Sequence, residues 1–217
     1  MFQRITALLF PPKCILCRSL LLQGETDLCH SCRTTTPEIE KSKFRFSFLA
    51  GWTAVWYYKD NPRKSLLRYK FSGRRSYAIP YGRLLAMKLE KEGLSDFDVL
   101  TWVPIAPARR FRRGYDQDEL LARALGSELG QPAVQTLRKI RNTPPQSGLG
   151  NISRRRANVL GAYRAVDPEA LRGKRILLVD DIITTGATIS ECARVLLTAG
   201  AKEVFCAAMA AANHDNK

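Results

Sequence analysis

Apolar positions along the chain fall into short continuous runs and into stripes at helical spacing. The runs, which are rich in strand-forming residues, are Trp52–Tyr58, Phe97–Val103 and Arg175–Val179. Helical stripes occur over Arg63–Phe71 and between Ile189 and Gly200, a glycine placed where a helix C-cap belongs. Arg175–Val179 shows no polar alternation, so we expect a strand buried on both faces, as in a parallel sheet. The pattern predicts an α/β domain.

The most informative stretch follows this last run. Two aspartates, Asp180 and Asp181, come directly after it, and a turn of small and hydroxyl residues comes next: Thr184, Thr185, Gly186, Ala187 and Thr188. The stripe that begins at Ile189 then predicts a helix. Free backbone N–H groups and the positive end of the helix dipole meet at such a turn, and the threonine hydroxyls add donors. The stretch therefore predicts a phosphate site.

The two aspartates indicate what the phosphate is attached to. Carboxylates repel a phosphate unless hydroxyls or a metal ion lie between them, and a ribose diol with a hydrated Mg²⁺ meets that need. The expected ligand is therefore a ribose 5-phosphate with a metal-bound group. A receiver domain also has an acidic pair after a strand, but only 36 residues follow Asp181, too few for that fold. A purely structural strand, turn and helix would not need the carboxylates.

The charge balance adds a second expectation. The chain has 35 Lys and Arg against 20 Asp and Glu, a net charge of +15, which attracts nucleic acid, anionic lipid or phosphate-rich small molecules. Arg109, Arg110 and Arg113 follow the strand that ends at Val103, and ligands bind beyond the carboxyl ends of parallel strands. These arginines are predicted to hold pyrophosphate. The alternative is that some of them only form a solvated basic surface.

The cysteines predict a separate metal site. Cys14, Cys17, Cys29 and Cys32 form two C-x-x-C pairs, the ligand spacing of a structural zinc ion with four thiolates. An iron–sulfur centre and redox pairs are the alternatives. We expect His30 to be a neighbour of this site and not a ligand. The predicted organisation is residues 1–43 for the N-terminal segment, finger and linker, and 44–217 for the α/β domain.

Two further features concern DNA and location. Five aromatic residues lie among basic residues, where they would either stack on the bases of single-stranded DNA or belong to the core: Trp56, Tyr57, Tyr58, Tyr69 and Phe71. No apolar run is long enough to span a membrane, and the N-terminus lacks a secretion-signal pattern, so a cytoplasmic location is expected. A long basic segment, Leu137–Asn158, is predicted to be a functional or mobile loop, with a helical part near Ser153–Val159.

The motifs, taken in order, resemble those of the ComF family. They are the cysteine pairs, the Val103–Gln117 segment with its Arg-Gly-Tyr-Asp-Gln end, Arg-Arg-x-Asn-Val at Arg155–Val159, and the Asp-Asp-Ile-x-Thr-Thr-Gly-Ala-Thr signature at Asp180–Thr188. The signature alone is similar to that of type I phosphoribosyltransferases. The family's last strand commonly ends with an arginine near Met209, which is absent here.

The resemblance implies an α/β type I phosphoribosyltransferase fold, with a parallel, flavodoxin-like sheet, helices on both faces and a flexible loop, preceded by a small zinc finger with four cysteine ligands. It implies 5-phosphoribosyl-1-pyrophosphate (PRPP) held by Asp180, Asp181 and Thr184–Thr188, with Mg²⁺ bound to the aspartates through water. It also implies a closing loop whose site residues are Arg138, Arg141, Gln146 and Arg155. Family members are tied to DNA uptake in natural transformation, so the uptake machinery is a possible partner.

Three functions follow as hypotheses. The first is a DNA-uptake protein that binds a phosphoribosyl ligand and single-stranded DNA. The second is an active phosphoribosyltransferase. Many base-using enzymes of that class have an acid two residues before the turn glycine, where this chain has Thr184, which is not a general base. An amine acceptor is therefore favoured over a nucleobase. The third is a PRPP-responsive regulator without catalysis.

Overall fold

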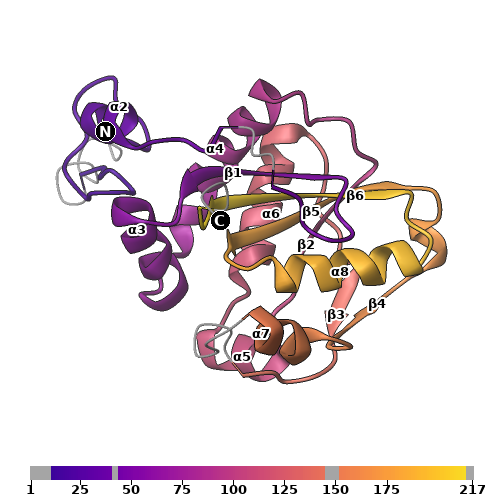
Figure 1. The fold of residues 1–217 in the computed structure, drawn as a ribbon. Coiled ribbons are helices and arrows are strands. Elements are labelled where there is room, and N and C mark those ends of the chain that lie inside the picture. Colours follow the sequence, from indigo (N-terminus) through magenta and orange to yellow (C-terminus); the bar gives the residue numbers. More distant parts are fainter. Residues whose placement is uncertain (1–10, 41–43, 145–151, 214–217) are drawn as a thin grey trace.

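A four-stranded parallel sheet forms the centre of the computed structural model, which describes residues 11–40, 44–144 and 152–213. Its strands are β1 (Gly51–Tyr57), β2 (Val99–Trp102), β5 (Arg175–Ile183) and β6 (Glu203–Ala211), in the order β1-β6-β5-β2 (Figure 1). All three pairings are parallel, so the carboxyl ends of the strands meet at one edge. The predicted α/β architecture is confirmed.

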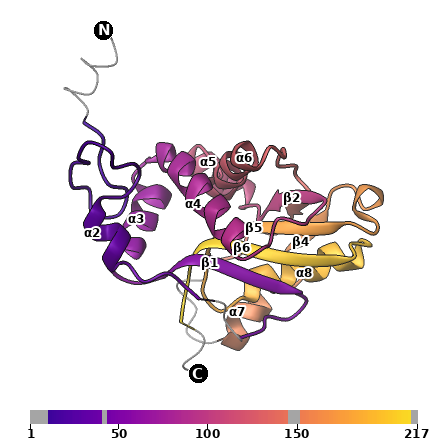
Figure 2. The ribbon, with the colours of Figure 1, turned by 90° about the horizontal axis from the view of Figure 1, so that it is seen from above.

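Helices cover both faces of this sheet, which explains why the strands lack polar alternation. Leu177 and Val179 of β5 pack into a cluster with α4 (Ala78–Lys91) and α6 (Gln117–Leu129). Ile176 and Leu178 point the other way, into a cluster with α8 (Ala187–Thr198). Figure 2 shows α4 and α6 on one side of the sheet and α8 on the other. Both faces of β5 are therefore shielded from solvent.

A glycine sets how closely the two helices on the first face approach each other. A Cβ atom at Gly82 of α4 would lie 2.7 Å from the carbonyl carbon of Ala124 on α6. Fully buried leucines on both helices, Leu85 and Leu89 on α4 and Leu121 and Leu125 on α6, fill the space on either side. The α4–α6 pair therefore covers one face of the sheet, with α6 on β2 and β5 and α4 on β1 and β6.

The remaining elements surround this core. They are α2 (His30–Thr35), α3 (Asp60–Phe71), the 3-10 turn η1 (Arg75–Tyr77), α5 (Pro107–Arg113), α7 (Ile152–Val159), the 3-10 turn η3 (Glu169–Leu171), and the antiparallel pair β3 (Leu137–Lys139) and β4 (Tyr163–Ala165). None of the helices in the described ranges is long and apolar enough to cross a membrane.

Three local features of the structure could not be taken from the sequence pattern alone. The arginines after Val103 lie on a helix, α5, because Pro107 occupies its first turn and no other glycine or proline interrupts it before Gly114. The Leu137–Asn158 segment begins as β3, which the sequence did not indicate, and its expected helical part near Ser153–Val159 is confirmed as α7. In α3, Phe71 is 65% exposed and Tyr69 is buried instead, because the Tyr69 hydroxyl donates to the carbonyl of Gln117 at 2.6 Å.

Candidate functional site

The predicted phosphate turn lies between β5 and α8 at the carboxyl edge of the sheet. Gly186 has φ +74°, and a Cβ atom there would lie 2.0 Å from the ring of Phe46, so only glycine fits. Helix α8 begins at Ala187, and among the described residues no side chain caps it. Its first N–H groups are therefore free of helical partners and face a small hollow lined by Asp180 and residues 182–189.

Strand β5 is longer than predicted and contains both aspartates, so their side chains leave the strand on opposite faces. Asp180 shares the face of Ile176 and Leu178 and lines the hollow at α8. Asp181 shares the face of Leu177 and Val179, toward α3 and α6, and its exposed fraction is 2%. Burial raises the pKa of Asp180 to about 7, and the neighbouring Asp181 raises it as well. The two aspartates therefore face different surroundings.

Two residues that the sequence reasoning missed lie beside Asp181. The Nζ atom of Lys70, from α3, is 2.9 Å from Asp181 Oδ2. Asp118, from the first turn of α6, is buried, and its carboxylate oxygen lies within 4.8 Å of those of Asp180 and Asp181. Burial lowers the pKa of Lys70, but the facing carboxylates of Asp181 and Asp118 outweigh it, so that the pKa is raised. Burial also raises the pKa of Asp118, as do Asp181 and Asp180.

A buried lysine that sequence reasoning also missed, Lys139, has no acidic partner in the described ranges. The Nζ atom of Lys139, which is 7% exposed, donates to the Tyr163 hydroxyl at 3.2 Å and lies 5.0 Å from the centre of that ring. Half-buried Arg109 donates to the carbonyl of Thr143 at 3.3 Å. Among the described residues, neither cation forms an ion pair. Burial, with a further contribution from Arg109, lowers the pKa of Lys139 to about 8.

The other predicted arginines have various surroundings. Arg110 pairs with Glu119 at 3.0 Å, and Arg113 donates to Gln117 at 2.9 Å and lies 4.9 Å from the centre of the Phe71 ring. Arg138 is exposed on the face of β3 opposite Lys139. The other residues predicted for the closing loop have separate positions. Arg141 donates to the carbonyls of Asn158 and Leu160, and Arg155 is half-buried on α7. Gln146 lies outside the described residues.

The four N-terminal cysteines come together. Their sulfur atoms all lie within 4.8 Å of one another, and those of Cys17 and Cys29 are 3.6 Å apart. Thiolates around one tetrahedral zinc ion are separated by about 3.8 Å, so the donor set fits. All six cysteines, which lie in the described part of the chain, are free of disulfides, and Cys192 and Cys206 are core residues.

Helix α3 holds this cysteine-rich segment against the domain. Arg68 donates to the carbonyls of Ile15 and Leu16 at 2.9 and 2.6 Å, and Ser65 donates to Ile15 at 2.5 Å. Lys70, which pairs with Asp181, follows on the same helix. The cysteine-rich segment therefore contacts α3 at Ser65 and Arg68, and Asp181 contacts the same helix at Lys70.

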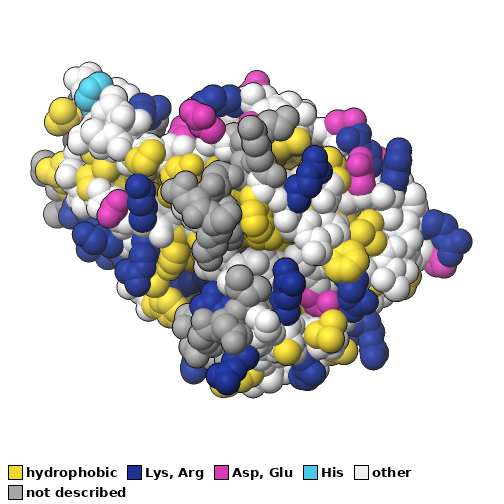
Figure 3. All heavy atoms as spheres, viewed as in Figure 1, with side chains coloured by type: hydrophobic (Ala, Val, Ile, Leu, Met, Phe, Trp, Pro, Cys, Tyr) yellow, Lys and Arg dark blue, Asp and Glu magenta, His cyan; other side chains and the backbone are white. Residues whose placement is uncertain are grey.

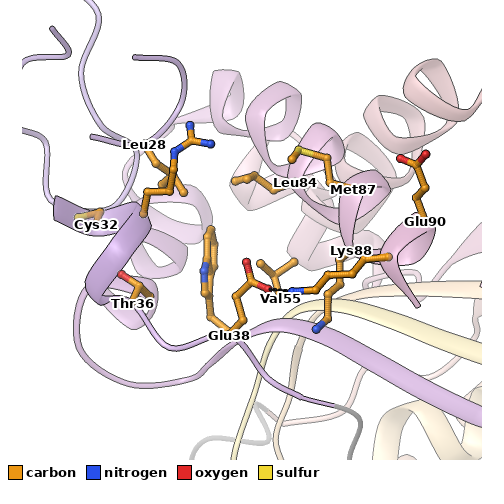
Figure 4. Close-up of a pocket in the computed structure, with 12 residues that line it drawn as sticks. Leu28, Cys32, Thr36, Glu38, Val55, Leu84, Met87, Lys88 and Glu90 are labelled. Atoms are coloured by element: carbon orange, nitrogen blue, oxygen red, sulfur yellow. Dashed lines mark hydrogen bonds and ion pairs between the residues drawn. The ribbon is translucent and has the colours of Figure 1, made fainter. Parts of the chain in front are cut away.

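A larger hollow of about 450 Å³ lies between α2 and α4 (Figure 4). Val55 and Trp56 of β1 line it, together with charged residues of both signs: Arg33, Glu38, Lys88, Glu90 and Lys91. Lys91 pairs with Glu38 at 3.2 Å, and Lys88 with Glu92 at 2.9 Å. A lining that mixes cations and anions favours an anion less than a turn that presents backbone N–H donors. The turn at β5–α8, where no side chain of the described residues caps α8, is therefore the stronger candidate for phosphate.

Comparisons with known proteins agree with this geometry. Residues 5–43 match a double zinc ribbon domain, and residues 119–217 match a phosphoribosyl transferase domain. The first match, together with the four close thiols, supports a structural zinc ion. The second covers β5, the turn and α8, so the sheet is that of a phosphoribosyltransferase fold.

Relatives with DNA-related names cover most of the chain. It is 31% identical to "DNA utilization protein YhgH" of Escherichia coli O157:H7 over 89% of this chain and 94% of that protein. The corresponding Salmonella typhimurium protein is 35% identical over 66% of this chain and 65% of its own length, just under two thirds. "Competence protein ComFC" of Bacillus subtilis is 26% identical over 86% and 78%.

Among solved structures, a glutamine PRPP amidotransferase from B. subtilis matches 65% of this chain and 30% of its own, with 25% identity and a TM-score of 0.46. That likeness is too distant to support any argument about chemistry. The relatives that match along nearly the whole chain establish to which family it belongs. The chain belongs to the ComF family of proteins with a phosphoribosyltransferase domain.

Proposed function

We propose that this chain is a DNA-uptake protein that binds PRPP with Mg²⁺ at the β5–α8 turn and single-stranded DNA on a neighbouring basic surface. The observation that carries the first part is the uncapped start of α8, which directly follows the positive-φ Gly186 and has buried carboxylates beside it. Such a turn binds a phosphate, and the acidic neighbours suit the sugar to which it is attached.

Each part of the site has a role in this proposal. The N–H groups of α8 and the hydroxyls of Thr184, Thr185 and Thr188 donate to the 5-phosphate. Asp180, and Asp181 beside it, accept from ribose hydroxyls and from the water shell of Mg²⁺, an ion that when bound neutralises the pyrophosphate charge. Lys139 is buried and Arg109 half-buried, and neither has an acidic partner in the described chain, so an anion there would relieve their repulsion. They suit the pyrophosphate.

Calorimetry of PRPP with Mg²⁺ tests the pocket. Thr188→Val keeps the side-chain shape but removes a donor, and we expect binding about tenfold weaker, the effect of one hydrogen bond to a charged group. Thr198→Val is the matched control, because Thr198 lies at the exposed far end of the same helix. A folded wild-type chain that releases no heat would refute the proposal, as would equal effects of the two variants.

Turnover is a separate question from binding. Half-buried Thr184 lines the hollow and offers no general base, which favours an amine acceptor or binding without reaction. Pyrophosphate release from PRPP should be measured with a panel of amines and nucleobases. Release with an amine that disappears in Asp180→Asn would establish an active phosphoribosyltransferase. PRPP binding without release by any acceptor would support a binding protein or a PRPP-responsive regulator.

The DNA part of the proposal rests on an exposed basic and aromatic surface formed by α5 and the end of α3. Phe111 is 92% exposed between Arg110 and Arg112, and Phe71 is 65% exposed under the Arg113 guanidinium. Lys and Arg side chains are visible over α3 in Figure 3. Aromatic rings beside cations stack on bases while the cations contact phosphates. Trp56 and Tyr69, which the sequence offered for stacking, are buried and do not contribute.

Fluorescence anisotropy with a labelled single-stranded oligonucleotide tests this surface. Phe111→Ala should weaken binding about fivefold to a hundredfold, the effect of one stacked base. Ile79→Ala is the control, since Ile79 is 58% exposed on another helix, α4. Binding should fall steeply with salt and be weaker for duplex DNA. Equal loss in both variants, or binding that is insensitive to salt, would contradict the assignment.

A further inference from the structure

The cluster of Asp118, Asp180 and Asp181 joins the first turn of α6 to the end of β5. One carboxylate oxygen from each residue lies within 4.8 Å of the others. Two oxygens on opposite sides of one ion are about 4.2 Å apart for Mg²⁺ and about 4.6–5.2 Å for Ca²⁺. The three carboxylates are therefore close enough to share a single divalent ion with little movement.

The charges of the cluster are not balanced by the protein. Three carboxylates face one ammonium, that of Lys70, which is 2.9 Å from Asp181 Oδ2. No other ion pair to these aspartates occurs in the described part of the chain. Ionised carboxylates gathered in a dry site repel one another strongly unless a cation lies among them. Lys70 neutralises the Asp181 side and leaves Asp118 and Asp180 without a counter-ion.

A second observation points to a missing ligand. Asp118 is only 3% exposed, and its Oδ1 atom has no hydrogen-bond partner among the residues described. Its other oxygen, Oδ2, accepts only a long bond of 3.4 Å from Gln117 Nε2. A buried, unpartnered oxygen costs about 1–3 kcal/mol, so its retention needs an explanation. An ion bound at Oδ1 supplies one.

We propose that Asp118, Asp180 and Asp181 bind one divalent cation, Mg²⁺ or Mn²⁺, through their carboxylate oxygens, without any phosphoribosyl ligand. Carboxylate oxygens are the donors that these hard cations prefer. The site differs from the water-bridged magnesium expected with PRPP, because it adds a ligand from α6 and is complete in the protein alone. It goes beyond the proposed function, and it concerns the protein without PRPP.

The site can be tested with the full, zinc-loaded chain and Mn²⁺, followed by the electron paramagnetic resonance signal of free Mn²⁺ in the absence of PRPP. We expect about one ion per chain and, in Asp118→Asn, binding weaker by about tenfold or more, since a charged ligand is lost. Asp167→Asn, at an exposed carboxylate, is the control and should bind as the wild type does. Unchanged zinc content and circular dichroism would show that each variant is folded.

Thermal unfolding gives an independent readout. Mn²⁺ should raise the Tm of the wild type and of Asp167→Asn, and leave that of Asp118→Asn nearly unchanged. The proposal is overturned if the folded wild type binds no Mn²⁺ without PRPP, or if Asp118→Asn binds it as well as the wild type does. Loss in Asp180→Asn but not in Asp118→Asn would place the ion on the β5 pair alone and also refute it.

Discussion

Replacing Lys139 by methionine should stabilise the protein near neutral pH, because the lysine is buried as a cation and forms no ion pair with the residues that the structure describes. Only the Tyr163 hydroxyl accepts from its Nζ atom in the described chain, and Arg109 lies nearby with the same charge. Methionine keeps the apolar stem and removes the charge. Greater stability in the variant would show that the charge is kept at this position for binding and not for folding.

The size of the effect follows from the pKa. Burial, with a further contribution from Arg109, lowers the pKa of Lys139 from 10.5 to about 8, and this difference corresponds to a penalty of about 3 kcal/mol at pH 7. The variant loses the 3.2 Å hydrogen bond and the 5.0 Å ring contact to Tyr163, at ~1 kcal/mol each. We therefore expect Lys139→Met to be more stable by about 1 kcal/mol at pH 7.

The sign should reverse at high pH. Between pH 8 and 10.5 the lysine is protonated in the unfolded chain and neutral in the folded one, so the unfolded state binds more protons. The stability of the wild type relative to the variant therefore rises through this window. Above it the penalty is gone, and so is the cation–ring contact, which needs the charge. The variant should then be the less stable protein by about 1 kcal/mol, because only the hydrogen bond to Tyr163 is lost.

Urea unfolding at pH 7, 8, 9 and 10, with saturating zinc, measures the difference in the free energy of unfolding between the wild type and Lys139→Met. The titration of all other groups is common to both proteins and cancels in this difference. Lys64→Met is the control, since Lys64 is exposed, and its difference from the wild type should not vary with pH. Pyrophosphate should stabilise the wild type more than Lys139→Met. A difference that is constant over the pH range would refute the reasoning and show that the lysine has a counter-charge.

Three further predictions concern the turn, a helix cap and the metal segment. Gly186→Ala should lower stability by at least ~2 kcal/mol and weaken phosphate binding, because it adds a clash with Phe46 to the strain of φ +74°. Gly161→Ala is the control for the strain alone, since Gly161 has φ +68° and an added Cβ atom would meet no other atom within 4 Å. Thermal unfolding of both variants measures the two effects. Asp116→Ala should cost about 1–2 kcal/mol in urea unfolding, because the carboxylate accepts from the N–H groups of Asp118, Glu119 and Ile105. Cys14→Ser should lose zinc, measured by elemental analysis, and expose the segment around Ile15 to hydrogen exchange while phosphate binding persists.

Each of these has a contrary result. Equal losses for Gly186→Ala and Gly161→Ala would mean that the Phe46 ring moves aside freely. A harmless Asp116→Ala would show that α6 does not depend on its cap. Asp116→Asn should cost less than Asp116→Ala, because its amide oxygen still accepts from Asp118 and Glu119, while the bond from the Ile105 N–H to Oδ2 is lost. A purified wild type without stoichiometric metal would show that the four cysteines are not a zinc site.

Much of this protein could be predicted because it is encoded by residues close together in the chain. The strand at Arg175–Val179, the turn at Gly186 and the two cysteine pairs each depend on a few neighbours, whose φ angles, periodicity or ligand spacing restrict the local structure. The direction of the β5 side chains also follows from strand geometry. What was missed there was only how far the strand continues, since Asp180 and Asp181 are poor strand formers held in place by β6.

Tertiary structure decided the partners of the charged residues. Lys70 and Lys139 lie in basic stretches where, by sequence, they resemble Arg68 and Arg138. Packing of α3 places Lys70 on Asp181, and the pairing of β3 with β4 turns Lys139 toward Tyr163 while Arg138 stays in solvent. A charge gains its role from the groups that face it after folding, and those come from distant segments, so local pattern cannot identify it.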